Sequence, residues 1–442
     1  MGSTWAYNWT SSSIVKNINT WSPFIFGENN ISSLFIILTL ILMLSSYLIS
    51  WGTITKNIKQ FSILLYVLTL ALVILFTTQH LLLFYIFFEA TLIPVFLMII
   101  LWGSREEKQK AGYYFFFYTF SGSLLMLACI LKLYNIVGTL HLEILHLIKL
   151  PKWIQFICFI GFTAGLAVKI PMVPFHIWLP QAHVEAPLAG SILLAGILLK
   201  LGGYGFIQIV LPLFPYGCWF FSPFMVTLSL IGIIYGGLTT CRQSDMKRLI
   251  AYSSVSHMGF VTLALFITPT LIGLEGSILI MLAHGLISPA LFIIAGVLYN
   301  RFGTRTIKYF KGLNTIMPLL SIFTFIIIIA SCGFPLTLNF IGEMYIFITV
   351  AANSTASFPV LLFILGLGPL LGIIYSLYFF NRLFFGQTSK YLFNIREASK
   401  KELFNLVIMI LPIILLGIVP FIFSQILYPI LLSIITHQNF LA

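Results

Sequence analysis

The sequence predicts an all-α polytopic membrane protein with about twelve transmembrane helices. Hydrophobic residues make up 60% of the chain and charged residues only 8%, whereas soluble domains carry about 25% charged residues. Many apolar runs approach the roughly 20 residues that a helix needs to cross a bilayer. The excess of 23 Lys and Arg over 11 Asp and Glu lies between these runs. This placement indicates membrane topology rather than nucleic-acid binding.

The apolar runs define twelve spans, two of which are too long to be single unbroken helices. The fifth contains Pro171 and Pro174, and the tenth contains Gly333 and Pro335. Because proline removes a backbone donor and clashes with the preceding turn, both spans are expected to be discontinuous helices. The spans cover residues 33 to 50, 61 to 78, 80 to 101, 113 to 137, 153 to 181, 187 to 211, 223 to 241, 248 to 267, 271 to 299, 315 to 350, 357 to 381 and 403 to 426.

The basic residues of the loops support this count. Twelve crossings place seventeen Lys and Arg on one side of the membrane and three on the other. This asymmetry follows the positive-inside rule, and it places both chain termini on the outer side.

The two broken spans are five crossings apart, so they traverse the membrane in opposite directions. Each is the fourth helix of a five-helix unit, and inverted repeats with broken helices are typical of secondary transporters. The expected organisation is a polar N-terminal segment at 1–32 on the outer side, a first span and loop at 33–60, repeats at 61–211 and 223–383, and a basic loop with a C-terminal helix at 384–442.

Four of the charged residues within the spans are candidates for a functional role, because insertion of a charge there costs about 2.5–3.5 kcal/mol. Glu89 is the only ionisable group in the middle of its span, and Lys169 lies two residues before Pro171. Lys200 is flanked by glycines that let helices approach closely. Glu343 is the only acid of the tenth span. These positions favour a functional role, although a hydrogen-bonded Glu89 or an interfacial Glu343 would be structural alternatives.

Four histidines add candidates for proton relay, because imidazole titrates near physiological pH. His257 lies among serines, and His284 lies four residues before Ser288. Both are expected to relay protons, although a buried histidine is also often just hydrogen-bonded. His176 and His183 flank the end of the broken fifth span and are candidates for relay or for capping.

The five cysteines are scattered along the chain without a CxxC pair. No metal site, iron–sulfur cluster or disulfide framework is expected from this spacing.

Several long motifs carry a resemblance to a known family. They are YIFFEATLIP, VKIPMVPFHIWLPQAHVEAPLAGS, LLKLGGYG, RQSDMKRLIAYSSVSHMG, MLAHGLISPALF and NFIGE. The chain resembles the antiporter-like membrane-arm subunits of mitochondrial NADH:ubiquinone oxidoreductase, respiratory complex I. The likeness runs from about residue 33 onward. Sister subunits tend to carry lysine where this chain has Glu343, so that residue favours the subunit 4 family.

The resemblance implies a proton-translocating subunit in the mitochondrial inner membrane, with its basic loops in the matrix and both termini in the intermembrane space. It implies no cofactor on this chain, since FMN, iron–sulfur clusters and ubiquinone belong to other subunits. Implied partners are sister membrane-arm subunits and lipids such as cardiolipin. The implied proton axis consists of a Glu89 and Lys169 pair, Lys200, His257, His284 and Glu343.

Family members usually have fourteen spans, and this chain is expected to lack the first two. Either the gene is shortened or a separate polypeptide supplies those helices. Two other functions remain open at this point. One is a stand-alone or hydrogenase-linked cation/proton antiporter of the same superfamily, and the other is a membrane scaffold, which would leave the charges within the spans unexplained.

Overall fold

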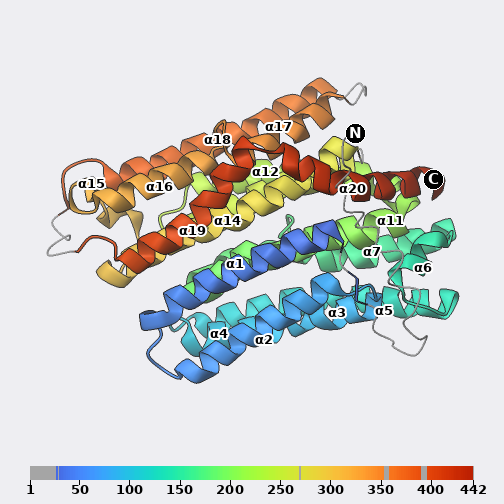
Figure 1. Ribbon diagram of the computed structural model, residues 1–442, viewed down its shortest axis with the longest axis horizontal. Helices are drawn as coiled ribbons and strands as arrows, with labels where there is room; N and C mark the ends of the chain where they lie inside the picture. Colours follow the sequence, from blue (N-terminus) through green and yellow to red (C-terminus); the bar gives the residue numbers. More distant parts are fainter. Residues whose placement is uncertain (1–25, 28, 268–269, 353–357, 390–395, 442) are drawn as a thin grey trace, which may run out of the picture.

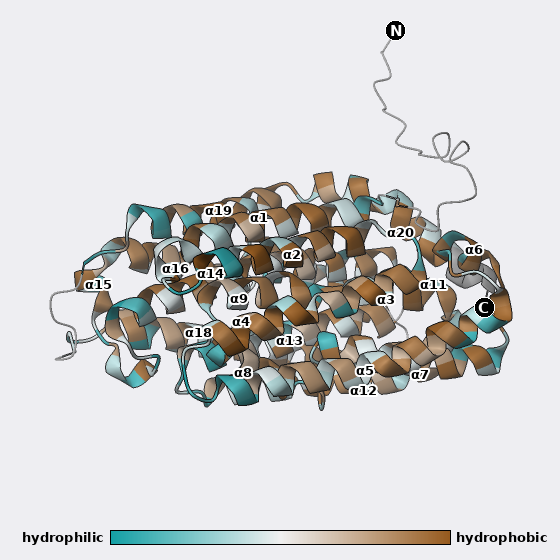
Figure 2. Cartoon of the chain, turned by 90° about the horizontal axis from the view of Figure 1, so that it is seen from below, coloured by the Kyte–Doolittle hydropathy of each residue, from teal (hydrophilic) through white to brown (hydrophobic). Residues whose placement is uncertain are grey.

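The computed structural model describes residues 26–27, 29–267, 270–352, 358–389 and 396–441. Most of the expected N-terminal segment 1–32, and the middle of the loop that begins at residue 384, lie outside these residues. The described chain is built from helices that run side by side along one direction (Figure 1). Apolar residues dominate the bodies of the helices (Figure 2). The expected all-α membrane fold is confirmed.

The first half of the bundle forms the lower part of Figure 1. Its helices are α1 (Asn30–Thr53), α2 (Ile58–Thr77), α3 (Leu81–Ala90), α4 (Leu92–Trp102), α5 (Lys108–Val137), α6 (Leu142–Leu147), α7 (Lys152–Lys169), α8 (Trp178–Glu185), α9 (Leu188–Leu193), α10 (Leu199–Gly205) and α11 (Leu211–Leu213). Two π-helical segments, Leu194–Leu198 and Phe206–Val210, join α9, α10 and α11 into one crossing.

The second half forms the upper part of Figure 1. Its helices are α12 (Pro215–Cys241), α13 (Met246–Ile267), α14 (Leu271–Phe302), a 3-10 turn (Ile307–Tyr309), α15 (Leu313–Ile316), α16 (Pro318–Ser331), α17 (Leu338–Ala351), α18 (Phe358–Phe384), α19 (Lys400–Ile418) and α20 (Phe421–Leu441).

Within the described residues the chain crosses the bundle twelve times. Eleven helical segments are long and apolar enough to span a membrane, and the shorter α16 and α17 together make the remaining crossing. The last crossing is longer than the sequence predicts. A bend after Ile418 separates α19 from α20, which continues to Leu441 rather than ending near residue 426.

Both expected helix breaks are present. The fifth crossing is interrupted between Lys169, where α7 ends, and Trp178, where α8 begins. The tenth is interrupted between Ser331 and Leu338. Gly333 adopts a φ of +67° in this second break, a conformation that glycine reaches without the steric cost of a side chain. The two breaks are therefore local consequences of Pro and Gly in otherwise apolar helices.

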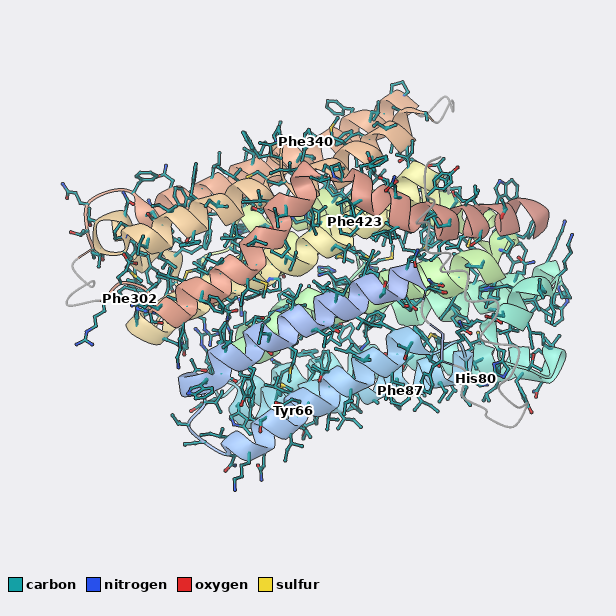
Figure 3. The ribbon with its side chains drawn as sticks, viewed as in Figure 1. Tyr66, His80, Phe87, Phe302, Phe340 and Phe423 are labelled. Carbon is teal, nitrogen blue, oxygen red and sulfur yellow. The ribbon has the colours of Figure 1, made fainter. Side chains whose placement is uncertain are left out.

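The loops that join α1 to α2, α4 to α5, α12 to α13 and α14 to α15 lie at one end of the bundle. We call this end the basic end, because these loops carry Lys56, Arg105, Arg242 and Arg305. The opposite end holds α6 and the end of α2. In Figure 3, the labelled residue Phe302 lies at the basic end and His80 lies at the opposite end.

Three crossings form the centre of the bundle. In the most apolar stretch of the crossing Leu188–Leu213, every residue is buried. In the corresponding stretches of α13 and α14, 89% and 94% of the residues are buried, against 28% in α18. Glycine makes this close packing possible: a side chain at Gly202 would lie 2.7 Å from the Leu166 carbonyl oxygen of α7. The central crossings also carry Lys200, His257 and His284, so the fold places these polar residues far from the outer surface.

Candidate functional site: a buried polar axis

Glu89 and Lys169 face each other between α3 and α7. The Lys169 side chain is 1% exposed, and its ammonium lies 4.7 Å from the centre of the Phe88 ring. The ammonium interacts electrostatically with the Glu89 carboxylate, and Ser123 of α5 lies within hydrogen-bonding reach of that carboxylate. Among the described residues no direct ion pair joins the two groups, and Lys169 Nζ has no hydrogen-bond partner. The groups are neighbours that attract each other without touching.

Lys200 is held at the centre of the bundle by an irregular helix. It lies in α10 between the two π-helical segments, which are frequent at functional sites. Its side chain is completely buried. Lys200 Nζ donates a hydrogen bond to the Ala195 carbonyl oxygen at 2.5 Å and lies 2.8 Å from His284 Nδ1. A lysine ammonium and an imidazole at this distance can exchange a proton directly.

The polar chain continues from α14 to α13 and α17. The rings of His284 and His257 have centres 5.7 Å apart, and His257 Nδ1 lies 4.0 Å from Glu343 Oε1. Asn339, one turn before Glu343 on α17, donates a hydrogen bond from Nδ2 to the same oxygen at 2.7 Å. Four of the six residues expected on the axis are thus joined in the order Lys200, His284, His257 and Glu343.

A small cavity accompanies this part of the chain. It has a volume of about 20 Å³, and its polar lining includes His257, His284, Ser288, Asn339 and Tyr375. A buried water molecule needs about 10–15 Å³ of such space and two to four polar partners. The cavity therefore has room for one water between the two histidines and α17.

The structure does not join Lys169 to Lys200. Among the described residues no hydrogen bond, ion pair or electrostatic interaction connects them. The two lysines come from α7 and α10, which pack closely where Gly202 and Gly205 face Leu166. The expected axis therefore consists of two polar groups, one at Glu89 and Lys169 and the other from Lys200 to Glu343.

The two further histidines have different surroundings. His183 of α8 is completely buried, and its ring stacks on Phe292 with the centres 4.6 Å apart. It interacts electrostatically with Lys200 and His284, so it lies beside the axis. His176 lies against the rings of Tyr235 and Tyr252 instead. Relay remains a candidate role for both, and only His183 is near the other axis residues.

Sequence reasoning missed several residues that complete the site. Tyr375 of α18 places its hydroxyl group 3.4 Å from His257 Nε2, and Asn339 positions Glu343. A polar residue one turn before Glu343 was a signal for Asn339, because residues four apart share a helix face. No sequence signal pointed to Tyr375, because tyrosine is common at membrane interfaces.

Two basic residues at the basic end are also buried, although the sequence places them in a loop region. Lys247 and Arg305 are 4% and 1% exposed. Lys247 Nζ donates a hydrogen bond to the Ala186 carbonyl oxygen at 2.9 Å, and Arg305 donates to the Val184 carbonyl oxygen. The last carbonyl groups of a helix need such donors. These two residues therefore hold the end of α8, the second half of the broken helix, in place.

No group of three or more His, Cys, Asp or Glu side chains in the described part of the chain has the arrangement of a metal site. The five cysteines are free. Cys332 contacts Ser376 near Tyr375, and Cys241 interacts electrostatically with Tyr375. The chemistry that these residues offer is proton transfer between lysine, histidine and carboxylate groups.

Comparison with known proteins assigns this arrangement to a family. The family described as "NADH:quinone oxidoreductase/Mrp antiporter, TM" matches residues 78–368. The NADH-ubiquinone oxidoreductase chain 4 of Chondrus crispus is 46% identical over 407 residues, which cover 90% of this chain and 82% of that protein. The corresponding protein of Arabidopsis thaliana is 41% identical over 426 residues, which cover 96% of this chain and 84% of that protein.

A solved structure supports the same assignment. A chain of respiratory complex I from Thermus thermophilus superposes with a TM-score of 0.86 and 30% identity, covering 94% of this chain and 86% of that chain. A chain of the Mrp complex from Dietzia sp. superposes with a TM-score of 0.81 at 18% identity, covering 92% and 84%, which shows a shared fold alone. The chain therefore belongs to the NADH:quinone oxidoreductase/Mrp antiporter family of membrane proteins.

Proposed function

We propose that this chain is a proton-translocating subunit in the membrane arm of respiratory NADH:ubiquinone oxidoreductase. The observation that carries the proposal is the buried chain of contacts from Lys200 through His284 and His257 to Glu343. It lies inside a twelve-crossing bundle whose relatives are named NADH-ubiquinone oxidoreductase chain 4. Charged groups at this depth are costly and are retained where a protein moves ions or protons.

In the mechanism that we propose, a change in the distance between Lys169 and Glu89 starts the proton transfer. When Lys169 stays near Glu89, its positive charge favours the ionised carboxylate. When that charge moves away, Glu89 is favoured to take up a proton, and the same change propagates to Lys200. Moving one charge against 100 mV requires about 2.3 kcal/mol, and a change of one pKa unit corresponds to 1.36 kcal/mol. Modest rearrangements of charge are therefore sufficient to drive the transfer.

The environment of the chain follows from this function. The basic end would face the mitochondrial matrix and the opposite end the intermembrane space, because positive loops are retained inside. FMN, iron–sulfur clusters and ubiquinone would be bound by other subunits, and sister membrane-arm subunits would be direct partners.

Lipids are further partners in this proposal. A surface cavity of about 430 Å³ is lined by Lys311, Arg382, Tyr378 and Phe385, with both aromatic residues exposed. Basic pockets between helices on the matrix side suit the phosphates of anionic lipids such as cardiolipin.

A separate polypeptide with two further helices is the last partner that we propose. Its contact surface would be the exposed apolar side of α2, where Ile63, Tyr66 and Leu70 are 59%, 54% and 62% exposed. Mass spectrometry of the purified complex would detect such a polypeptide, and cross-links to α2 would identify its place.

Substitution of Lys169 in the assembled enzyme tests the function. Lys169→Met removes the charge that faces Glu89, so we expect fewer protons pumped per NADH and slower quinone reduction. Met172→Leu, a buried volume-conserving change in the same break, is the matched control and should leave both unchanged. Normal proton stoichiometry together with full quinone reductase activity in Lys169→Met would refute the role given to Lys169.

A further inference from the structure

A second cavity lies at the end of the bundle opposite the basic end. It has a volume of about 220 Å³ and is bordered by the end of α2, the start of α6, the segment Phe206–Val210 and α20. Its volume leaves room for several water molecules. Eight of its fourteen lining residues are polar, and they are Asn29, Thr78, Gln79, Glu143, His146, Tyr204, Gln208 and Ser433.

Gln208 indicates that this cavity holds water. Its side chain is 8% exposed, and its Nε2 has no hydrogen-bond partner among the described protein groups. A buried amide without a partner is unfavourable, and ordered water normally satisfies such groups. Because Gln208 lines the cavity, water in the cavity is the available partner.

Tyr204 separates this cavity from the polar axis. It lies four residues after Lys200 in α10, so both side chains share one face of the helix. Tyr204 lines the cavity, and its hydroxyl group donates a hydrogen bond to the Phe76 carbonyl oxygen at 3.2 Å. Its ring packs against those of Phe76 and Phe35, with the centres 5.0 Å and 5.8 Å away. Lys200 Nζ meanwhile points to Ala195 and His284.

We propose that this cavity is the aqueous mouth through which Lys200 exchanges protons with the intermembrane space, and that Tyr204 closes the mouth. The inference rests on the proposed proton translocation and adds a route to it. In this route, Tyr204 shifts from the Phe76 carbonyl group, and water from the cavity then reaches the Lys200 ammonium. The Lys200 proton leaves along Tyr204 and Gln208, and His284 can then supply the next proton to Lys200.

Access of a thiol reagent to position 208 tests the mouth. Gln208→Cys is introduced into the assembled complex, and intact mitochondria are treated with a small, membrane-impermeant, cationic methanethiosulfonate. Labelling of this chain is measured by mass spectrometry. Ile209→Cys is the matched control, since Ile209 is 1% exposed and does not line the cavity. We expect labelling at position 208 alone, and a fall in proton pumping after labelling.

Two outcomes would overturn the proposal that this cavity is an aqueous mouth. One is a thiol at position 208 that stays unlabelled in intact mitochondria or reacts only in inverted vesicles. The other is a labelled thiol that leaves pumping unchanged although Lys200→Met impairs it. Normal pumping in Lys200→Met would instead refute the proposed function itself, whatever the labelling shows, so the two failures are distinguishable.

Tyr204→Phe supplies a second, independent test. It keeps the ring packed against Phe76 and Phe35 and removes only the hydroxyl group. A relay hydroxyl predicts pumping slower by about tenfold or more at an unchanged amount of assembled complex. A purely structural role predicts normal pumping, and that result would remove Tyr204 from the route.

Discussion

Gly333 lies in the second helix break and leaves just enough space for Glu343. A side-chain carbon at Gly333 would be 2.5 Å from Glu343 Oε2, about 0.9 Å closer than an ordinary contact. In Gly333→Ala the carboxylate must therefore move by about this amount. Its other oxygen accepts the 2.7 Å hydrogen bond from Asn339 and lies 4.0 Å from His257.

The size of the effect follows from these contacts. Hydrogen bonds to charged groups contribute about 1.5–3 kcal/mol, and 1.36 kcal/mol corresponds to a tenfold change. We expect loss of the Asn339 contact to slow proton pumping by about tenfold or more. Alanine at a positive φ adds about 1–2 kcal/mol of backbone strain, so this cost needs a control of its own.

Gly303→Ala is that control. Gly303 has a φ of +69°, almost the same as Gly333, and no atom of the described residues lies within 4 Å of the position of its added side chain. Both variants carry similar backbone strain, and only Gly333→Ala presses on Glu343. The assay measures assembled complex on native gels, and then proton pumping per NADH in inverted vesicles. Equal pumping in both variants, at equal assembly, would refute the reasoning.

Two more predictions concern Lys200 and the opposite end of the bundle. Lys200→Met removes two hydrogen bonds of a buried ammonium and should slow proton pumping by about tenfold or more. The control Leu201→Met, at a buried neighbour, should leave pumping unchanged. Equal pumping rates in the two variants would contradict this prediction. Burial, and then the nearby His141, lowers the pKa of His80 below 6.5. Next to His80, the Leu81 amide donates a hydrogen bond to the Leu140 carbonyl oxygen at 2.9 Å. This local structure is fully stable above pH 6.5 and weakens as pH falls below it, because the unfolded chain then binds the proton more readily. Hydrogen exchange of the Leu81 amide, corrected for its intrinsic rate, should therefore become faster as the pH is lowered from about 7.5 to 5.5. His80→Gln should remove this pH dependence. Slower corrected exchange at the lower pH would contradict the prediction.

The helix bundle was predictable because its signals are local. Apolar runs gave the twelve crossings, and Pro171 and Pro335 gave the two breaks. The twelfth crossing was placed too short because residues 427 to 441 mix apolar and polar side chains. The length and hydropathy of an apolar run do not indicate where a helix bends, so they could not predict the bend after Ile418 that joins α19 to α20.

The contacts of the site were less predictable because they join distant parts of the chain. Lys200 and His284 are 84 residues apart, and no helical periodicity relates two separate helices. Arg305 is one of the seventeen basic residues that the expected topology places in loops, where a charge is normally solvated. Its burial follows from the end of α8, whose carbonyl groups need a donor in the folded bundle. The roles of the axis residues in proton transfer remain predictions for the experiments described above.

The gap between Lys169 and Lys200 tests the central claim most directly. A cryo-electron microscopy map of the assembled complex, sharp enough to resolve ordered water, would show what occupies it. The proton-translocation account predicts a chain of waters from Lys169 to Lys200, with a further water beside His257 and His284. Tightly packed apolar side chains across that gap, without water in any state of the working enzyme, would contradict it.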